Sequence, residues 1–498
     1  MSMYLLADGV TFRESLGNGG GTLTVRYPYR IIRLSRAGAK AIQLLCGPGD
    51  TKFTWDEKLA AFAAGLEDQG ILTRSFPTLS DDRLPWVSII IPTYNRPQML
   101  DKCIESLIAL DYPREKYEII VVDDASPVPV DLGRYSRSVR LIRLARNGGP
   151  GAARNEAVRQ AKGEIIAFLD DDCLAEKNWL RSLAPCFQYT DVAAAGGRVE
   201  SAGLIRPLEK YEQVQSPLLM GNTLRKVRKG SSVSYLPTCN LLVRKRSVLA
   251  AGAFDPLMRV GEDVDLCWQI LEKGEHIYYV PEGLVFHHHR STLSPFLKRR
   301  YNYGQSEAKL QVRYPTEKRR LVFFPGNHAV FGITALISLT AGAGAGLAAC
   351  VALVLANLVW QSLSKLHGIK AGECKPKFRQ VFLATARSQG AAFYIYGQHY
   401  SHYYSGILTF LALFVSPGLA LLLFGLHALP GIVDYKLKKP AMRVARFCFY
   451  HFLENAFYQA GVISGCLSEH NWRPMAMDFI RADANLLQRL AAKNQINN

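Results

Sequence analysis

Residues 165–172 read Ile-Ile-Ala-Phe-Leu-Asp-Asp-Asp, an apolar run that ends in three consecutive carboxylates. A continuous apolar run is typical of a strand buried on both faces of a parallel sheet. Carboxylates at the tip of such a strand repel one another, and a divalent cation that prefers oxygen ligands, Mg²⁺ or Mn²⁺, would relieve the repulsion. The stretch therefore predicts an α/β fold with a metal site at a sheet edge. The alternative is a solvated acidic loop.

Strands and helices alternate upstream of this stretch. Apolar runs predict strands at 87–91, 118–122 and 164–169, and the intervening patterns predict helices at 96–110 and 151–161. This repetition implies right-handed crossovers and a parallel sheet. Ligands of such sheets bind at the carboxyl ends of the strands, so the residues after each strand are the candidates for a site.

Polar residues follow the first two strands. Residues 92–96, Pro-Thr-Tyr-Asn-Arg, form a turn that could cradle a base or ribose, and residues 123–126 read Asp-Asp-Ala-Ser. Asp124 could accept hydrogen bonds from a uracil or a ribose. An Asx turn or helix cap explains the second motif equally simply.

A glycine-rich turn, Asn147-Gly148-Gly149-Pro150-Gly151, opens the next helix, which carries Arg154. Glycines allow close backbone approach, and a helix N-terminus favours anionic groups. Neither the phosphate-binding loop of nucleotide triphosphatases nor the dinucleotide fingerprint is present.

Two further motifs lie downstream. Residues 261–265, Gly-Glu-Asp-Val-Asp, precede a helical pattern, and Asp263 is placed to take a proton from a hydroxyl. Glu262 and Asp265 could instead be first-turn residues favoured by the helix dipole. Residues 285–290 read Val-Phe-His-His-His-Arg, in which His287 could complete a metal shell with Asp172 and Arg290 could pair with phosphate.

The order of these motifs resembles glycosyltransferase family 2 over about residues 86–290. The resemblance implies a GT-A fold, a nucleotide-sugar donor and inversion at the anomeric carbon. It assigns Asp124 to uridine, Asp170 and Asp172 to a D-x-D pair whose second member touches the metal, and Asp263 to the catalytic base. The Gln-x-x-Arg-Trp motif of processive synthases is absent, which argues against a long polymeric product.

The assignments that follow are expectations. The donor residues are Pro92, Thr93, Tyr94, Asn95, Arg96, Asp124, Asn147, Gly149, Arg154, Asp170, Asp171 and Arg290. The acceptor-side residues are Asn240 and Glu262, and the metal ligands are Asp172 and His287.

A narrower resemblance covers nearly the whole chain. Residues 27–34, Tyr-Pro-Tyr-Arg-Ile-Ile-Arg-Leu, followed by an Ala-rich helix, resemble PqqD-type peptide-recognition domains. Residues 285–290 with 300–306, Arg-Tyr-Asn-Tyr-Gly-Gln-Ser, resemble mycofactocin-system glycosyltransferases. That family is implied to add glucose from UDP-glucose to a redox cofactor derived from the Val–Tyr end of a peptide. Two alternatives are a rhamnosyltransferase-like enzyme of surface-polysaccharide assembly acting on a lipid-linked acceptor, and a non-enzymatic recruitment protein.

Four regions are expected along the 498 residues. Residues 1–76 form a small α+β, winged-helix-like unit with strands at 9–13 and 22–34, helices at 37–45 and 55–68 and a short strand at 71–72. Residues 77–85 are a linker, 86–310 the GT-A domain, and 311–498 an apolar helical region.

The net charge of +18 suits anionic lipid, phosphate or nucleic acid. Basic residues, including Lys298, Arg299 and Arg300, flank two apolar stretches at 328–360 and 406–433. Each stretch is one long helix or a hairpin, and its flanks favour hairpins in the inner leaflet at the cytoplasmic face of the membrane. A soluble helical domain is the alternative. The tail 441–493 is expected to form an amphipathic helix.

The remaining sequence features concern compartment and partners. The ten scattered Cys fit a reducing cytosol, and the N-terminus has no signal-peptide pattern. Nucleic-acid binding is not expected, because the candidate recognition helix at 37–45 is mostly apolar.

Overall fold

The computed structural model describes residues 3–15, 19–25, 30–47, 56–317, 320–323, 325–341, 343–368 and 377–481. The chain divides into two compact units. We call Thr73–Glu317 with Ser401–Met475 the core unit, and Met1–Leu72 with Lys318–Tyr400 and Ala476–Asn498 the flanking unit. Each unit is described by itself.

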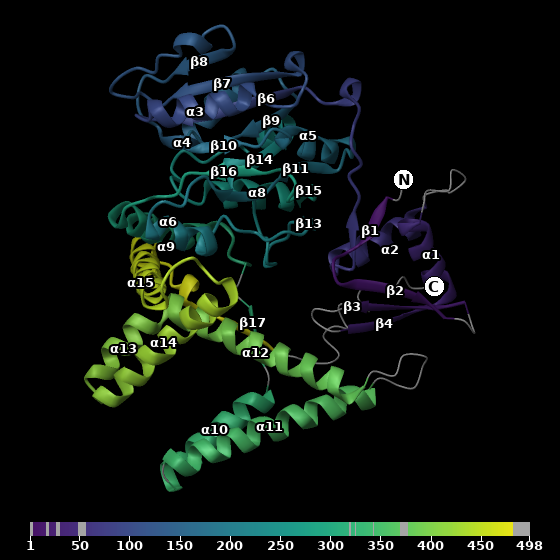
Figure 1. Ribbon diagram of the computed structural model, residues 1–498, viewed down its shortest axis with the longest axis vertical. Coiled ribbons are helices and arrows are strands. Elements are labelled where there is room, and N and C mark those ends of the chain that lie inside the picture. Colours follow the sequence, from purple (N-terminus) through teal and green to yellow (C-terminus); the bar gives the residue numbers. More distant parts are fainter. Residues whose placement is uncertain are drawn as a thin grey trace. The chain divides into compact units, whose positions relative to one another are not determined.

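An eight-stranded sheet forms the centre of the core unit, in the order β13-β15-β11-β14-β9-β6-β7-β8 (Figure 1). Its strands are β6 (Val87–Thr93), β7 (Tyr117–Asp123), β8 (Val139–Arg143), β9 (Ile165–Phe168), β11 (Val192–Gly196), β13 (Arg225–Lys226), β14 (Leu241–Arg244) and β15 (His276–Tyr279). Strands β6, β7 and β9 are parallel, as predicted, and β8, which was not predicted, pairs in parallel with β7. The prediction of a wholly parallel sheet is wrong, because β14 runs antiparallel to both β9 and β11. An apolar run marks a buried strand but carries no information about its direction.

Helices cover both faces of this sheet. Helices α3 (Pro97–Ile108) and α5 (Trp179–Leu183) pack on one face, through side chains such as Leu100 and Leu180. Helices α4 (Gly149–Gln160), α7 (Lys245–Ala250) and α8 (Glu262–Glu272) pack on the other. The three layers leave the carboxyl ends of β6, β7 and β9 at one edge, where the polar motifs begin.

A second, three-stranded sheet lies in the order β10-β16-β12, formed by β10 (Cys173–Ala175), β16 (Val285–His287) and β12 (Val199–Ser201). In the antiparallel pair of β10 and β16, Cys173 lies opposite His287. The His288 N–H also donates to the Asp172 carbonyl over 2.9 Å. This register brings the histidine motif beside the acidic motif, although more than a hundred residues separate them.

The helices α6 (Pro207–Gln215), α9 (Leu293–Arg313), α13 (Ser405–Leu413), α14 (Pro417–Lys438) and α15 (Val444–Ser468) complete the core unit. Helix α15 lies alongside α9 (Figure 1). Their backbones approach so closely that a Cβ on Gly461 would lie 2.0 Å from the Tyr301 carbonyl oxygen, and one on Gly304 2.1 Å from that of Tyr458. Only glycine fits at these crossings.

The flanking unit begins with β1 (Tyr4–Leu6), β2 (Val10–Glu14), β3 (Gly21–Val25), β4 (Arg30–Leu34), α1 (Arg36–Cys46) and α2 (Glu57–Asp68), after which β5 (Leu72–Arg74) leads into the core unit. The predicted single strand over 22–34 is wrong: β3 and β4 are two antiparallel strands. The Ser35 and Asp56 side chains cap the N-termini of α1 and α2 by accepting from the Gly38 and Leu59 N–H groups.

The rest of the flanking unit comprises β17 (Arg320–Phe323), α10 (Pro325–Ala341), α11 (Ala343–Gly368), most of α12 (Phe378–Tyr403) and β18 (Asp478–Arg481), with β17 and β18 paired in parallel. Each predicted apolar stretch forms two helices that pack together, α10 with α11 and α13 with α14. Within the described residues one helical segment, Ala348–His367 of α11, has the length and composition needed to cross a membrane. The predicted tail helix corresponds to α15 as far as Ser468, whereas its predicted continuation is wrong at Asp478–Arg481, which form β18. Residues beyond 481 lie outside the described part of the chain.

Candidate active site

The acidic motif after β9 is held by residues of the turn after β6. The Thr93 hydroxyl donates to Asp171 Oδ2 over 2.7 Å. Arg96 Nη1 donates to Asp171 Oδ1 over 3.1 Å and to Asp172 Oδ2 over 2.8 Å. The motifs that follow β6 and β9 were predicted to lie at one edge of the sheet, and these hydrogen bonds join them directly.

Burial and charge act oppositely on these carboxyls. Burial raises the pKa of Asp171 to about 6, against the opposing charge of Arg96. Burial also acts to raise the pKa of Asp172, but the nearby charges of His287 and Arg96 outweigh it and leave that pKa below its usual value. Asp172 is thus the more readily ionised of the two.

Asp172, Cys173 and His287 offer ligand atoms that lie within 4.8 Å of one another. His287 Nε2 is 3.5 Å from Asp172 Oδ1, and the buried His287 Nδ1 has no hydrogen-bond partner. Burial holds the pKa of the Cys173 thiol well above its usual value, which disfavours a thiolate ligand. The carboxylate and the imidazole are the chemically suitable donors, and both are the residues predicted from the sequence.

Arg154 of α4 connects the end of β9 with the start of α8 through two ion pairs. Its guanidinium is 2% exposed and lies 2.6 Å from Asp170 Oδ1 and 3.1 Å from Glu262 Oε1. A buried arginine held by two carboxylates fixes the start of α8 against the end of β9. Arg154 was predicted to bind the donor, and here both its terminal nitrogens serve this ion-pair network.

Asp263 lies in the first turn of α8, where Gly261 adopts a left-handed φ of 85°. Its Oδ1 accepts from the Val264 N–H over 2.8 Å. Burial, followed by the charge of Glu262, raises its pKa to about 7. A carboxylate with this pKa is suited to accept a proton near neutral pH.

A pocket beside Asp263 is lined by residues of the acidic motif, of the histidine motif and of the start of α8. Its lining includes Asp170, Glu262, Asp263, His287 and Arg290 from the predicted set. It also includes Glu212, His289, Arg299, Arg300 and Tyr303, which were not predicted. Burial and neighbouring positive charges lower the pKa of His289 to about 3, so this ring is neutral.

The basic residues of α9 correct one expectation. Lys298, Arg299 and Arg300 were expected to flank a membrane segment, but Arg299 and Arg300 line the pocket. Arg300 pairs with Glu212 Oε1 at 2.9 Å and with Glu454 Oε1 of α15 at 2.7 Å. Positions 299, 300 and 303 share one helical face, and that spacing was the available signal.

Arg290 and Arg299 are the two pocket arginines for which the described residues supply no ion-pair partner. Arg299 lies over the Tyr303 ring at 5.5 Å, and its buried Nε has no hydrogen-bond partner. Burial and the charge of Arg299 lower the pKa of Arg290. Two guanidinium groups of the pocket are therefore left for an anionic ligand to pair with.

The glycine-rich turn contacts Asp124. Gly148 N–H and Gly149 N–H each donate over 2.8 Å to one oxygen of its buried carboxylate, and Asn147 Nδ2 donates to its carbonyl over 3.2 Å. The N–H groups at the start of α4 were expected to bind an anionic ligand, but they bind the carboxylate of Asp124. The predicted Asx turn belongs to the neighbouring Asp123, which accepts from Ser126 N–H at 2.8 Å.

The turn after β6 is partly open. Pro92 and Thr93 are buried in the strand, whereas Tyr94, Asn95 and Arg96 are exposed. Asn95 has a left-handed φ of 55°, and its N–H donates to the Ser126 hydroxyl over 2.9 Å. The exposed Tyr94 ring therefore lies next to the sheet edge that carries the acidic motif.

Asn240 does not occupy the predicted acceptor position. Its side chain is fully buried, accepts from Trp179 Nε1 at 2.8 Å, and donates to the carbonyls of Arg198 and Gly283. With both Nδ2 protons used, this amide holds β14 against two loops. Nothing in the local sequence distinguishes such an internal role from an acceptor contact.

Comparisons with known proteins identify this arrangement. The model of the family "Glycosyl transferase family 2" matches residues 88–250. The pre-mycofactocin glycosyltransferase of Mycobacterium tuberculosis (strain ATCC 25618 / H37Rv) is 32% identical over 403 residues, which cover 79% of this chain and 80% of that protein. The chain belongs to the pre-mycofactocin glycosyltransferase family.

This glycosyltransferase has further similarities. Glycosyltransferase AglE from Haloferax volcanii is 27% identical over 247 residues, 48% of this chain and 78% of that one. The solved mannosyltransferase PcManGT from Pyrobaculum calidifontis, in complex with GDP-Man and Mn²⁺, is 17% identical with a TM-score of 0.45, covering 82% of this chain and 97% of that one. The family assignment and the mixed sheet together establish a glycosyltransferase with a GT-A type α/β core.

Proposed function

We propose that this enzyme transfers a hexose, with glucose from UDP-glucose as the expected donor, to a peptide-derived precursor of a redox cofactor. The similarity to a pre-mycofactocin glycosyltransferase over 79% of the chain carries the proposal. A pocket that holds a titratable carboxylate and two arginines without an ion-pair partner among the described residues supports it. Inversion at the anomeric carbon is part of the proposal.

Asp263 is the proposed catalytic base. It removes the proton from the acceptor hydroxyl as that oxygen attacks the anomeric carbon, while the bond to the nucleotide diphosphate breaks. Glu262, held by Arg154, lies on the acceptor side and adds the negative charge that helps to raise the pKa of Asp263. The pKa of the catalytic base therefore depends on Glu262, whose position is fixed by its ion pair with Arg154.

Asp172 and His287 are the residues that would hold Mn²⁺ or Mg²⁺. The fit rests on their 3.5 Å separation and on the donor set of one carboxylate and one imidazole. When bound, the cation offsets the charge that develops on the departing diphosphate.

The donor is proposed to lie across the acidic sheet edge. Asp124 faces the uridine, the turn of Tyr94 to Arg96 borders the base and ribose, and Asp170 and Asp171 lie towards the sugar and metal. Arg290 pairs with the diphosphate. We propose that Arg299 does so too, because both guanidinium groups line the pocket and neither forms an ion pair with a carboxylate of the described residues. Guanidinium groups recognise phosphate oxygens through paired hydrogen bonds.

The other regions have proposed roles of their own. Residues 1–76 act as a PqqD-like domain that takes up the precursor peptide as an added strand. The helical region within 311–498 associates with the cytoplasmic face of the cell membrane. The basic flanks and the apolar helices support this second role.

Mass spectrometry of a defined reaction tests the function. The mixture holds the purified protein, Mn²⁺, UDP-glucose and the decarboxylated Val–Tyr-derived acceptor, with EDTA and Asp263→Asn as controls. We expect hexose additions that are absent from both controls. Metal-dependent release of UDP without transfer to this acceptor would reject the acceptor and turn attention to lipid-linked sugars.

A further inference from the structure

We propose that the hairpin of α13 and α14 is a wedge that enters one leaflet of an anionic membrane and holds the catalytic unit against it. This inference rests on the proposed membrane association and specifies the element, the depth and the lipid. The hairpin belongs to the core unit, so it moves with the active site.

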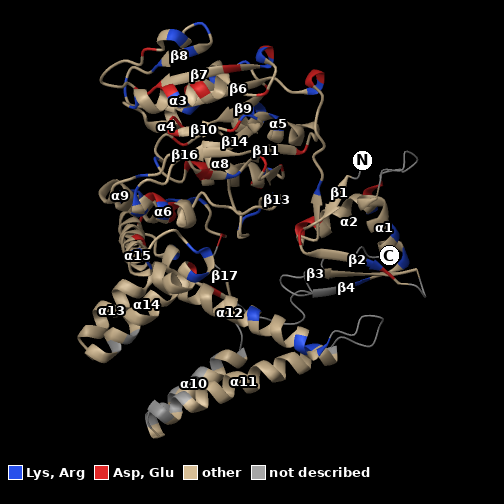
Figure 2. Ribbon diagram, in the orientation of Figure 1, with Lys and Arg blue, Asp and Glu red and all other residues tan. Residues whose placement is uncertain are grey.

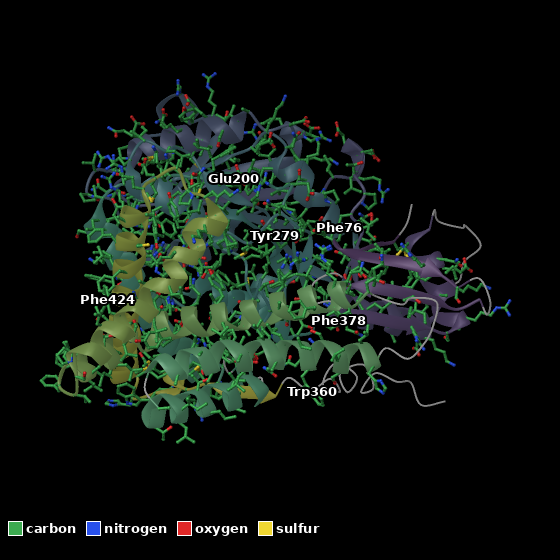
Figure 3. The ribbon with its side chains drawn as sticks, turned by 60° about the horizontal axis from the view of Figure 1, so that its bottom comes forward. Phe76, Glu200, Tyr279, Trp360, Phe378 and Phe424 are labelled. Carbon is green, nitrogen blue, oxygen red and sulfur yellow. The ribbon has the colours of Figure 1, made fainter. Side chains whose placement is uncertain are left out.

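The hairpin surface is apolar and exposed. Residues 405–433 contain no Asp, Glu, Lys or Arg, and both helices appear uncharged over this length in Figure 2. Exposure is highest at the tip, where Phe414 is 76%, Val415 77% and Leu421 72% exposed. Phe424, further along α14, is also exposed and is labelled in Figure 3. Soluble proteins rarely display a continuous apolar surface of this kind without a partner.

Polar groups of the hairpin face inward. The Ser405 hydroxyl donates to the Ser401 carbonyl over 2.9 Å and shares a 2.8 Å hydrogen bond with Nδ1 of the buried His427 in α14. The Ser401 hydroxyl donates to the His427 carbonyl over 3.2 Å. Their contacts close the seam between the helices and leave apolar side chains outside. The Ser401 and Ser405 hydroxyls are thus satisfied within the protein, as lipid surroundings require, whereas the buried His427 Nε2 has no partner among the described residues.

The dimensions select one leaflet. The nine residues of α13 rise about 14 Å, whereas the hydrocarbon core is about 30 Å thick and each leaflet about half of that. Pro417, at the start of α14, and Lys436 are separated by about 28 Å along the helix, so the shorter α13 sets the depth and α14 lies inclined within the leaflet. With the tip near the bilayer midplane, Lys436 reaches the headgroup layer of the same leaflet.

Positive charge gathers where the hairpin would leave the lipid. Lys436, Lys439, Arg443 and Arg446 are all exposed between the end of α14 and the start of α15. Each basic residue near an anionic surface contributes attraction that salt screens. The combination of an apolar tip and a basic base selects a phospholipid surface over a second protein copy.

Vesicle flotation of the full chain tests the wedge. The probe is vesicles of equal parts phosphatidylcholine and phosphatidylglycerol, compared with phosphatidylcholine alone. Phe414→Asp with Val415→Asp should reduce binding to the mixed vesicles at least about tenfold, because two apolar anchors are replaced by charges. Both sites are exposed, so folding in water is not challenged.

Ile205→Asp with Leu257→Asp is the matched control, since these apolar side chains of the core unit are 88% and 83% exposed. The control should bind vesicles as the parent does. Replacement of Lys436, Lys439 and Arg443 by Gln should abolish the preference for anionic vesicles. Equal binding by the tip variant and the parent would overturn the wedge and leave the proposed membrane association intact, with α10 and α11 as its carriers. No vesicle binding by the parent would overturn both.

Hydrogen exchange distinguishes a wedge from a crossing. In a wedge, vesicles should slow exchange most strongly at the turn around Val415 and Ser416, because it lies deepest. A turn that exchanges as fast with vesicles as without them would show a full crossing and overturn the one-leaflet assignment. A parent chain that dimerises without lipid, with a monomeric tip variant, would assign the surface to a second copy instead.

Discussion

At the scale of single residues, Asp263 links catalysis to pH. Its pKa of about 7 means that kcat should rise through neutral pH as the carboxylate ionises. Asp263→Asn should abolish hexose transfer and leave UDP affinity unchanged, because only proton removal is lost. Calorimetric titration with UDP beside the transfer assay checks both statements. A large loss of UDP affinity would instead place Asp263 in the donor site.

The raised pKa of Asp263 also means that its ionised form lowers the free energy of unfolding. Its folded pKa lies above the value of about 3.9 in unfolded chains, so its contribution favours folding at low pH and is lost as pH rises through about 7. Asp263→Asn should therefore raise the melting temperature relative to the parent at pH 8 more than at pH 5. Thermal unfolding at the two values provides the comparison.

Asp172 is expected to couple metal and donor binding. Asp172→Ala removes a ligand 3.5 Å from His287 and should weaken Mn²⁺ and UDP together, each by at least about tenfold. Titration of Mn²⁺ with and without UDP measures both. Unchanged Mn²⁺ affinity would remove Asp172 from the metal site.

Arg299 should contribute to donor affinity from α9. Arg299→Met keeps most of the apolar stem but removes a charge-assisted phosphate contact, so UDP should bind about 10- to 100-fold more weakly. Arg246→Met, at an exposed position of α7, is the control and should bind UDP normally. A loss confined to the acceptor KM would mean that Arg299 recognises an acceptor anion.

How far the sequence predicts the site depends on where each residue lies. Asp171, Asp172 and Asp263 follow strand ends or begin a helix, and those positions are visible in the hydrophobic pattern. The helical spacing places Arg299 on one face of α9, but only the packing of the helices directs that face, and Glu212 of α6, into the pocket. Asn240 shows the converse error, because a buried amide and a ligand-binding amide have the same sequence signature.

At the scale of elements, the contact of α9 with α15 positions the pocket. Gly461→Val places a side chain where a Cβ already lies 2.0 Å from the Tyr301 carbonyl oxygen. The helices must separate, so the melting temperature should fall by several degrees and UDP affinity should drop with it. Gly425→Ala in α14 is the control, since nothing lies within 4 Å of the added Cβ. Equal melting temperatures for the two variants would contradict close packing.

The hydrophobic pattern predicted the elements from β2 to β9 apart from β8, together with α8, the two apolar hairpins and the tail helix, but no element between β10 and α7. Strands β6, β7 and β9 were predicted because buried parallel strands read as apolar runs. Strand β8 was missed because its outer residues alternate with polar ones at the sheet edge. The direction of β14 and the break between β3 and β4 depend on pairing with distant or neighbouring strands, which composition alone does not specify.

At the scale of the whole molecule, the core unit is discontinuous in sequence. A chain ended at Glu317 keeps the sheet and α9 but loses Glu454, the partner of Arg300, and the surface that covers Gly304. It should fail to bind UDP and should aggregate, because a long apolar helix face is uncovered. A chain ended at Met475 retains the entire core unit and should bind UDP. Binding by both would show that α15 is dispensable for the donor site.

This discontinuity sets an order on synthesis at the ribosome. The strands and the acidic motif emerge early, yet α9 cannot settle until α10 to α14 have been translated and α15 has followed them. During that interval the nascent chain carries an incomplete pocket and uncovered glycine crossings. The apolar hairpin emerges before α15, so lipid or a chaperone can receive it first, and the active site is completed only when the last long helix arrives.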